Sequence, residues 1–159
     1  TISKHDIYHS PVDETSLILH KTNKMNLNIP ISEVMTKDVV SVNPSQKLID
    51  VKHIFEKKNF HHHIPVTEKG ELKGMISLVD YLYAIKNASL DDDDSAYHNL
   101  SVKDIMREYP VTKASSDTIK DVFQELAKGD VHAILIADDK KLKGIVSTAD
   151  VIRFFLGQA

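Results

Sequence analysis

The sequence predicts an α+β fold made of two β-α-β-β-α repeats that pack against each other as a pseudo-twofold pair. One stretch of the chain recurs later in the sequence, which is the signature of an internal repeat. Each copy alternates short apolar runs with segments in which apolar residues recur at helical spacing. A single copy buries too little apolar surface to be stable alone, so the two copies are expected to share an interface.

The repeat consists of two aligned parts. Residues 31–58 align with residues 102–129, and residues 62–80 align with residues 132–150. The second part contains the triplet Leu-Lys-Gly in both copies, and the register slips by one residue in the turn between the two parts. Turns tolerate such insertions, so the pattern indicates a duplication.

Each copy predicts the same elements in the same order. The first copy predicts a strand at 39–42, a helix with a lysine-rich solvent face at 45–58, strands at 61–66 and 72–77, and a helix at 77–85. The second copy predicts a strand around Val111, a helix at 116–128, strands at 131–136 and 142–147, and a helix at 147–156. In both copies a short turn precedes the first strand.

The chain is expected to divide into an N-terminal extension (1–29), a first repeat (30–86), an acidic linker (87–99) and a second repeat (100–159). The extension contains one predicted short strand at 17–19. Asp91–Asp94 are four consecutive aspartates, but Ala96 and Val102 stand where a calcium loop needs glycine and glutamate. A solvated linker is therefore the favoured interpretation. The first residue is a threonine, so the chain is open to being a piece of a longer protein.

Composition excludes several functional classes. With a formal charge of −3 over 159 residues, the chain has no basic surplus for binding nucleic acid or an anionic membrane. No stretch has the length of a membrane span or the pattern of a secretion signal, so a cytoplasmic location is expected. The absence of cysteine excludes disulfides, thiolate metal sites and a cysteine nucleophile. The five glycines do not form a dinucleotide-binding or P-loop pattern, and the sequence predicts no enzyme.

A Ser-x-x-Asp pattern follows the second predicted strand of the hairpin in both copies, at Ser77 and Asp80 and at Ser147 and Asp150. One interpretation is a helix cap, in which the serine and the acid satisfy free backbone amides at the start of a helix. The other is a binding site, in which the carboxylate accepts hydrogen bonds from a ribose diol. Recurrence at the same point of a duplicated unit favours the binding site.

Histidines form a second cluster at residues 61–63. His61 and His63 share one face of the predicted strand, but no third metal ligand is identifiable nearby in the sequence. An interpretation as surface or strand-end histidines is therefore favoured over a metal site. His62 and His132 are equivalent residues in the two copies and are candidates to face a phosphate.

Together these features resemble a tandem cystathionine-β-synthase (CBS) domain pair, or Bateman module. The resemblance rests on the strings GMISLVD and GIVSTAD, the HIPV strand and the VM and IM openings, and it extends from Ile31 to about Leu156. It implies a regulatory module that needs no cofactor and binds AMP, ADP, ATP or S-adenosylmethionine between the repeats. It also implies a homodimer.

The resemblance further implies roles for individual residues. Asp80 and Asp150 would bind the ribose, and Ser77 and Ser147 the sugar or phosphate, with Thr148, His62 and His132 nearby. The predicted strands would enclose adenine through Val39, Val40, Ser41, Pro110, Val111, Thr112, Ile64, Pro65, Ile134 and Leu135.

Two departures from the family pattern bear on affinity. Val79 and Ala149 stand where many members have a basic or hydroxyl residue, and Leu135 replaces the proline found at Pro65. Two other functions are compatible with the sequence. One is a ligand-free scaffold for homodimerisation or partner interaction, and the other is a histidine-dependent metalloenzyme.

Overall fold

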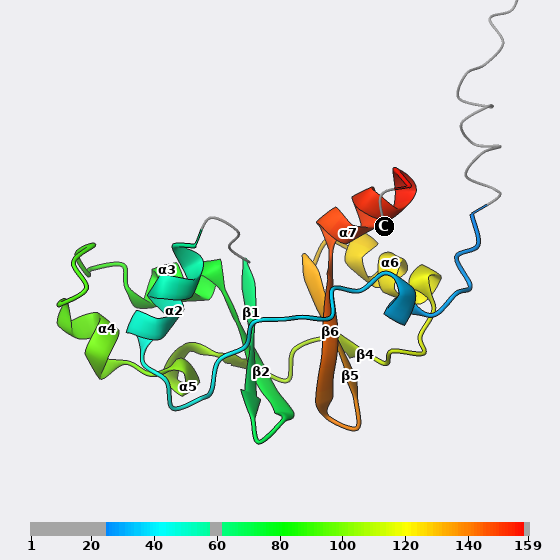
Figure 1. Ribbon diagram of the computed structural model, residues 1–159. Helices are drawn as coiled ribbons and strands as arrows, with labels where there is room; N and C mark the ends of the chain where they lie inside the picture. The colour runs from blue at the N-terminus through cyan, green and yellow to red at the C-terminus, as the bar shows by residue number, and fades with distance from the viewer. Residues whose placement is uncertain (1–24, 58–61, 158–159) are drawn as a thin grey trace, which may run out of the picture.

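Two β-hairpins lie side by side at the centre of the molecule, and helices cover the outer side of each (Figure 1). The computed structural model describes residues 25–57 and 62–157. The first hairpin consists of β1 (His63–Glu68) and β2 (Glu71–Ser77), and the second of β5 (Ala133–Asp138) and β6 (Lys141–Ser147). The predicted hairpins are thus confirmed.

The strands form one sheet in the order β1-β2-β6-β5-β4, with β3 (Arg107–Glu108) paired to β2 and β4 (Thr112–Lys113) parallel to β5. The two hairpins meet where Glu71 of β2 pairs with Lys141 of β6 in antiparallel orientation. These two residues are equivalent in the repeat. An antiparallel pair of equivalent residues lies on the axis that relates the copies, and the α+β pseudo-twofold fold is therefore confirmed.

The helices follow the duplicated order of the sequence. Their bounds are η1 (Ile31–Glu33), α2 (Leu48–Phe55), α3 (Leu78–Ala84), α4 (Ser95–Asn99), α5 (Val102–Ile105), α6 (Ile119–Ala127) and α7 (Thr148–Phe155). The main helices α2 and α6 are shorter than predicted. The helix α6 begins at the cap Thr118, whose side chain accepts a hydrogen bond from the amide of Asp121.

The two repeats exchange their opening turns. Ile31 is buried in the core around α6, whereas its equivalent Val102 is buried in the core around α2. The backbone contacts are exchanged in the same way, because the Ile31 amide donates to the Asp117 carbonyl (2.7 Å) and the Val102 amide to the Gln46 carbonyl (2.9 Å). Each core is therefore completed by a segment of the other repeat.

Two glycines explain how closely the exchanged segments approach the sheet. A Cβ added at Gly74 would lie 2.6 Å from the Arg107 carbonyl oxygen, and one at Gly144 would lie 2.7 Å from that of Thr36. The methionine that precedes each of these carbonyl residues also packs against the glycine: Met106 against Gly74 and Met35 against Gly144. The glycine that recurs in the duplicated string thus has a packing cause in both copies.

The prediction of a strand at 39–42 is wrong for most of that segment. Only Val42 pairs with a neighbouring strand, through a parallel bridge to Val66. The chain crosses from one half of the molecule to the other here (Figure 1), and the Val39 amide donates to the carbonyl of Lys37 instead of to a strand. Val42 is therefore the one residue of this segment that forms a backbone bridge with β1. The strand predicted at 17–19 lies outside the described residues.

The acidic linker is partly solvated and partly core. Asp91–Asp93 are exposed, but the helix α4 that follows places Tyr97 at 0% exposure in the first core. The Tyr97 hydroxyl donates to the Ser89 carbonyl (2.6 Å). The prediction that the lysines of α2 face solvent is wrong at Lys52, which is 6% exposed because it lies beneath this segment and pairs with Asp92.

Candidate functional site

A cleft of about 670 Å³ lies between the repeats, at the end of the sheet where β2 and β6 lead into helices. Its wall includes Ser77 and Val79 at the start of α3 and Ser147 and Asp150 at the start of α7. Equivalent residues of the two copies therefore face one cavity, as expected for a pseudo-twofold pair. The cleft is a place where a small molecule can contact both repeats at once.

The first repeat closes the start of α3 with a capping box. The Asp80 amide donates to Ser77 Oγ (3.1 Å), and Ser77 Oγ and the Ser77 amide donate to Asp80 Oδ2 (2.5 and 3.2 Å). The capping interpretation of this serine is thus confirmed. The second oxygen, Oδ1, is free for another donor.

That donor is Arg107 from β3. Its Nε and Nη2 lie 3.0 and 2.9 Å from Asp80 Oδ1. Burial opposes ionisation of Asp80, but the Arg107 guanidinium and the hydrogen bonds from Ser77 outweigh it and hold the pKa of this carboxyl below its ordinary value. Asp80 is therefore a paired carboxylate, 15% exposed, and its neighbours Ser77 and Val79 line the cleft.

The second repeat repeats this arrangement with a different arginine. The Ser147 amide and Oγ donate to Asp150 Oδ2 (2.7 and 2.8 Å). Asp150 Oδ1 accepts a hydrogen bond from Nη2 of Arg153, one turn further along α7. In both copies Oδ2 of the aspartate completes the helix cap and Oδ1 accepts from a guanidinium, and in the first copy Arg107 Nε also donates to Asp80 Oδ2 (3.1 Å).

Three histidines, His62, His63 and His132, line the same cleft. The carbonyls of His62 and His132 accept the amides of Leu78 (2.8 Å) and Thr148 (3.2 Å), which fixes each strand start beside a helix start. Burial lowers the pKa of His63, and the nearby His62 and His132 lower it further. Burial thus favours the neutral form of His63 at the wall of a cleft that also contains Arg153.

The cleft brings together part of the predicted site. The predicted residues that line it are His62, Ser77, His132, Ser147, Thr148 and Asp150. Asp80 is not among the lining residues, but its neighbours Ser77 and Val79 are. These residues come from both repeats, as the resemblance implied.

Other predicted residues lie elsewhere. Ile64 and Ile134 point into the two hydrophobic cores because side chains alternate along a strand, and the proposed adenine contact is corrected for them. Pro65 and Leu135, their neighbours on the opposite strand face, are also buried.

The predicted first strands do not reach this cleft as a group. Pro110 and Thr112 line a second hollow, of about 780 Å³, at the hairpin-turn end of the sheet. Val40 and Val111 are exposed, Val39 is half-buried, and the Ser41 hydroxyl is hydrogen-bonded to the Thr67 hydroxyl (3.1 Å).

Sequence reasoning missed three residues of the site. Thr36 and Arg153 line the cleft, and Arg107 pairs with Asp80. The i,i+3 spacing of Asp150 and Arg153 on a predicted helix is a signal that could have revealed that pair. Arg107 is far from Asp80 in sequence, so only the exchange of opening turns between repeats brings them together.

A family comparison identifies the fold. The CBS domain model matches residues 31–87 and 102–157. The chain belongs to the CBS domain family. CBS domain pairs are generally regulatory modules without catalytic function. No helix within residues 25–57 or 62–157 is long and apolar enough to span a membrane.

Similar proteins share this organisation. Protein MJ1225 of Methanocaldococcus jannaschii is 24% identical over 152 residues, covering 92% of this chain and 54% of that protein, so the chain spans about half of this relative. The crystal structure of MJ1225 has a TM-score of 0.71 at 23% identity and covers 89% of this chain and 53% of that one.

Two solved structures contain nucleotides. CBSX2 in complex with AMP has a TM-score of 0.69 at 24% identity, covering 81% of this chain and 97% of that one. The CBS domain of a bacterial CNNM/CorC family Mg²⁺ transporter in complex with ATP has a TM-score of 0.70 at 18% identity, covering 92% and 99%. At these identities the similarity shows the fold.

Proposed function

We propose that this CBS pair is a regulatory module that binds an adenosyl ligand, of the AMP, ADP, ATP or S-adenosylmethionine class, in the cleft between the repeats. The observation that carries the proposal is that the helix starts bearing the two equivalent aspartates meet at one cleft. Asp150 lines it, as do Ser77 and Val79 next to Asp80, and each aspartate is paired with an arginine. AMP and ATP in the solved CBS structures support the same ligand class.

The ribose would bind by exchange of hydrogen-bond partners. A guanidinium and a vicinal diol both present two donors to a carboxylate, so a ribose can replace the arginine on the outer oxygen of Asp150. The inner oxygen keeps its bonds to Ser147 and the helix stays capped. The exchange of partners therefore leaves the N-terminal cap of α7 intact.

The arginine that the ribose displaces would be available to bind a phosphate of the ligand. Arg153 is half-exposed at the cleft wall, and His62 and His132 lie in the same cleft. Released from Asp150, the guanidinium can pair with a phosphate, for which its fork geometry is suited. This basic set compensates for the apolar residues Val79 and Ala149 at the positions where many family members have phosphate contacts.

The expected affinity is modest. Burying about 150 Å² of adenine contributes about 4 kcal/mol, and a charge-assisted ribose pair adds about 1.5 to 3 kcal/mol before the cost of displacing arginine. After association costs this corresponds to micromolar to millimolar dissociation constants. Such constants suit the sensing of an abundant nucleotide.

Calorimetric titration with AMP, ADP, ATP and S-adenosylmethionine tests the proposal. We expect Asp150→Ala and Asp80→Ala to weaken binding of the preferred ligand about tenfold or more, because each removes a ribose acceptor. Asp121→Ala is the matched control, since Asp121 closes the same kind of capping box on α6 away from the cleft. If Asp150→Ala and Asp80→Ala bind the ligand as tightly as Asp121→Ala and the wild type do, the two aspartates do not bind the ribose.

The alternative function is a ligand-free scaffold, supported by exposed apolar residues on α3, on α7 and at the C-cap of α7. These residues are Val79, Leu82, Tyr83, Ile152, Phe155 and Leu156. Exposed apolar residues of this kind suit an interface between two copies, and we propose that the chain forms a homodimer. A thermal-shift panel separates the functions: stabilisation by an adenosyl compound supports sensing, and no response to any supports the scaffold. Light scattering of wild type and Ile152→Asp tests the dimer.

A further inference from the structure

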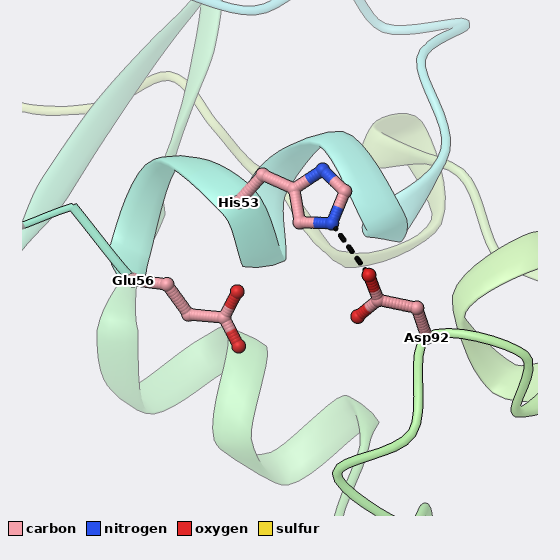
Figure 2. Close-up of side chains that lie close together, drawn as sticks. All are labelled: His53, Glu56 and Asp92. Atoms are coloured by element: carbon pink, nitrogen blue, oxygen red, sulfur yellow. Dashed lines mark hydrogen bonds and ion pairs between the residues drawn. The ribbon is translucent and has the colours of Figure 1, made fainter.

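A second cluster of polar side chains lies on the outer surface of the first repeat, away from the cleft. His53 and Glu56 lie one turn apart at the end of α2, and Asp92 of the acidic linker lies opposite them (Figure 2). One ligand atom from each lies within 4.8 Å of the other two, and this is the only such group of three among residues 25–57 and 62–157. The cluster joins residues far apart in sequence.

Lys52 neutralises part of this cluster without using all of its oxygens. Its ammonium pairs with Asp92 Oδ1 and lies 2.8 Å from Glu56 Oε1, and these carboxylates raise the pKa of Lys52. Asp92 Oδ2 lies 2.9 Å from His53 Nε2. Lys52 thus pairs with one oxygen of each carboxylate, while one ligand atom of each of the three side chains in the group lies close to the other two.

The cluster is partly ordered before any ion arrives. The carbonyl of Asp92 is hydrogen-bonded to His98 Nε2 (2.8 Å), which ties the linker backbone at Asp92 to α4. The three side chains are about half exposed, so they can close by the small distance that metal bonds of about 2.0 to 2.2 Å require. Asp91 and Asp93 add negative charge beside the group, which favours approach of a cation.

We propose that His53, Glu56 and Asp92 form a surface site for a divalent transition metal such as Zn²⁺. One imidazole nitrogen and two carboxylate oxygens make a ligand set that zinc accepts, with water completing the coordination. The imidazole favours zinc over Mg²⁺ and Ca²⁺, which prefer oxygen alone. An ion here ties the linker between the repeats to α2, so it stabilises the first repeat.

Zinc titration of the full chain, freed of metal with a chelator, tests the site by calorimetry at pH 7.5. We expect His53→Ala and Asp92→Asn each to weaken one binding event at least tenfold. Asp130→Asn is the matched control, because Asp130 is an exposed aspartate of the second repeat outside the group. The sequence has nine histidines, and others can also bind zinc, so the result is read from the difference between the variants and the control. Identical titrations for all of these variants would overturn the proposal.

Lys52→Met gives an independent test of opposite sign. The substitution removes the ammonium next to the two carboxylates and keeps an unbranched side chain over Tyr97. Loss of one positive charge at this distance should tighten zinc binding about tenfold. Unchanged or weaker binding in a folded Lys52→Met variant would contradict the proposed ligand set, whereas tighter binding that His53→Ala abolishes supports it.

Discussion

The two repeats position the same carboxylate but pair it with arginines from different places. Asp80 is paired with Arg107, which belongs to the segment entering the other repeat, whereas Asp150 is paired with Arg153 on its own helix. The residue equivalent to Arg107 is Thr36, and the one equivalent to Arg153 is Tyr83. Duplication therefore preserved the cap and the acid, while the cation arose separately in each half.

The cores differ in the same way. The first is completed by Tyr97 from the linker, and the second by Leu27 and Ile29, which precede the exchanged turn. Equivalent strands and helices thus pack against unlike partners. The difference teaches that the halves of a duplicated fold can share a backbone and still respond to different substitutions.

The largest expected effect concerns the first core. Tyr97→Ala should lower the free energy of unfolding by about 3 to 5 kcal/mol, because it empties a fully buried aromatic site. Chemical denaturation measures this loss. Tyr109→Ala is the control, since Tyr109 is 93% exposed and should change stability by less than about 0.5 kcal/mol. Similar losses in the two variants would show that the linker is not part of the core.

A smaller effect should separate the two arginines. Arg153→Ala is expected to weaken AMP binding about tenfold, because the guanidinium lies in the cleft and would pair with phosphate, whereas adenosine binding should not weaken, because the variant also removes the competitor for Asp150. Arg107→Ala removes a competitor for Asp80 and should not weaken either ligand. Titration of both variants with both ligands checks the contrast. Equal losses for AMP in the two variants would contradict it.

The smallest effect concerns pH and the pair His63 and Ala133, which are equivalent in the repeats. Burial lowers the pKa of His63 in the folded state, so below about pH 6.5 the unfolded chain binds more protons than the folded one. Stability contributed by this group therefore falls as pH drops from about 6.5 to the folded-state pKa.

His63→Ala, which makes the first repeat resemble the second, should flatten the pH dependence of the unfolding free energy in this range. Wild type and variant are compared by denaturation at several pH values between 5 and 8. Parallel pH profiles would assign the dependence to another group.

Much of the fold was predictable because the relevant signals are local. The hairpins follow from short apolar runs around turn residues, and the helix starts follow from Ser77 and Ser147 with their acids three residues on. The six predicted cleft residues are those near these helix starts. The adenine-facing strand residues Ile64 and Ile134 were misplaced, because sequence alternation does not say which strand face is covered.

The sequence by itself determined that the chain is a duplication, where each hairpin turns, and which two acids recur at helix starts, because these features depend on neighbours along the chain. Only the tertiary structure decided which arginine meets which acid, that the opening turns change places, and that Tyr97 and Lys52 are buried. Those outcomes depend on packing between distant segments, whose register no local pattern specifies.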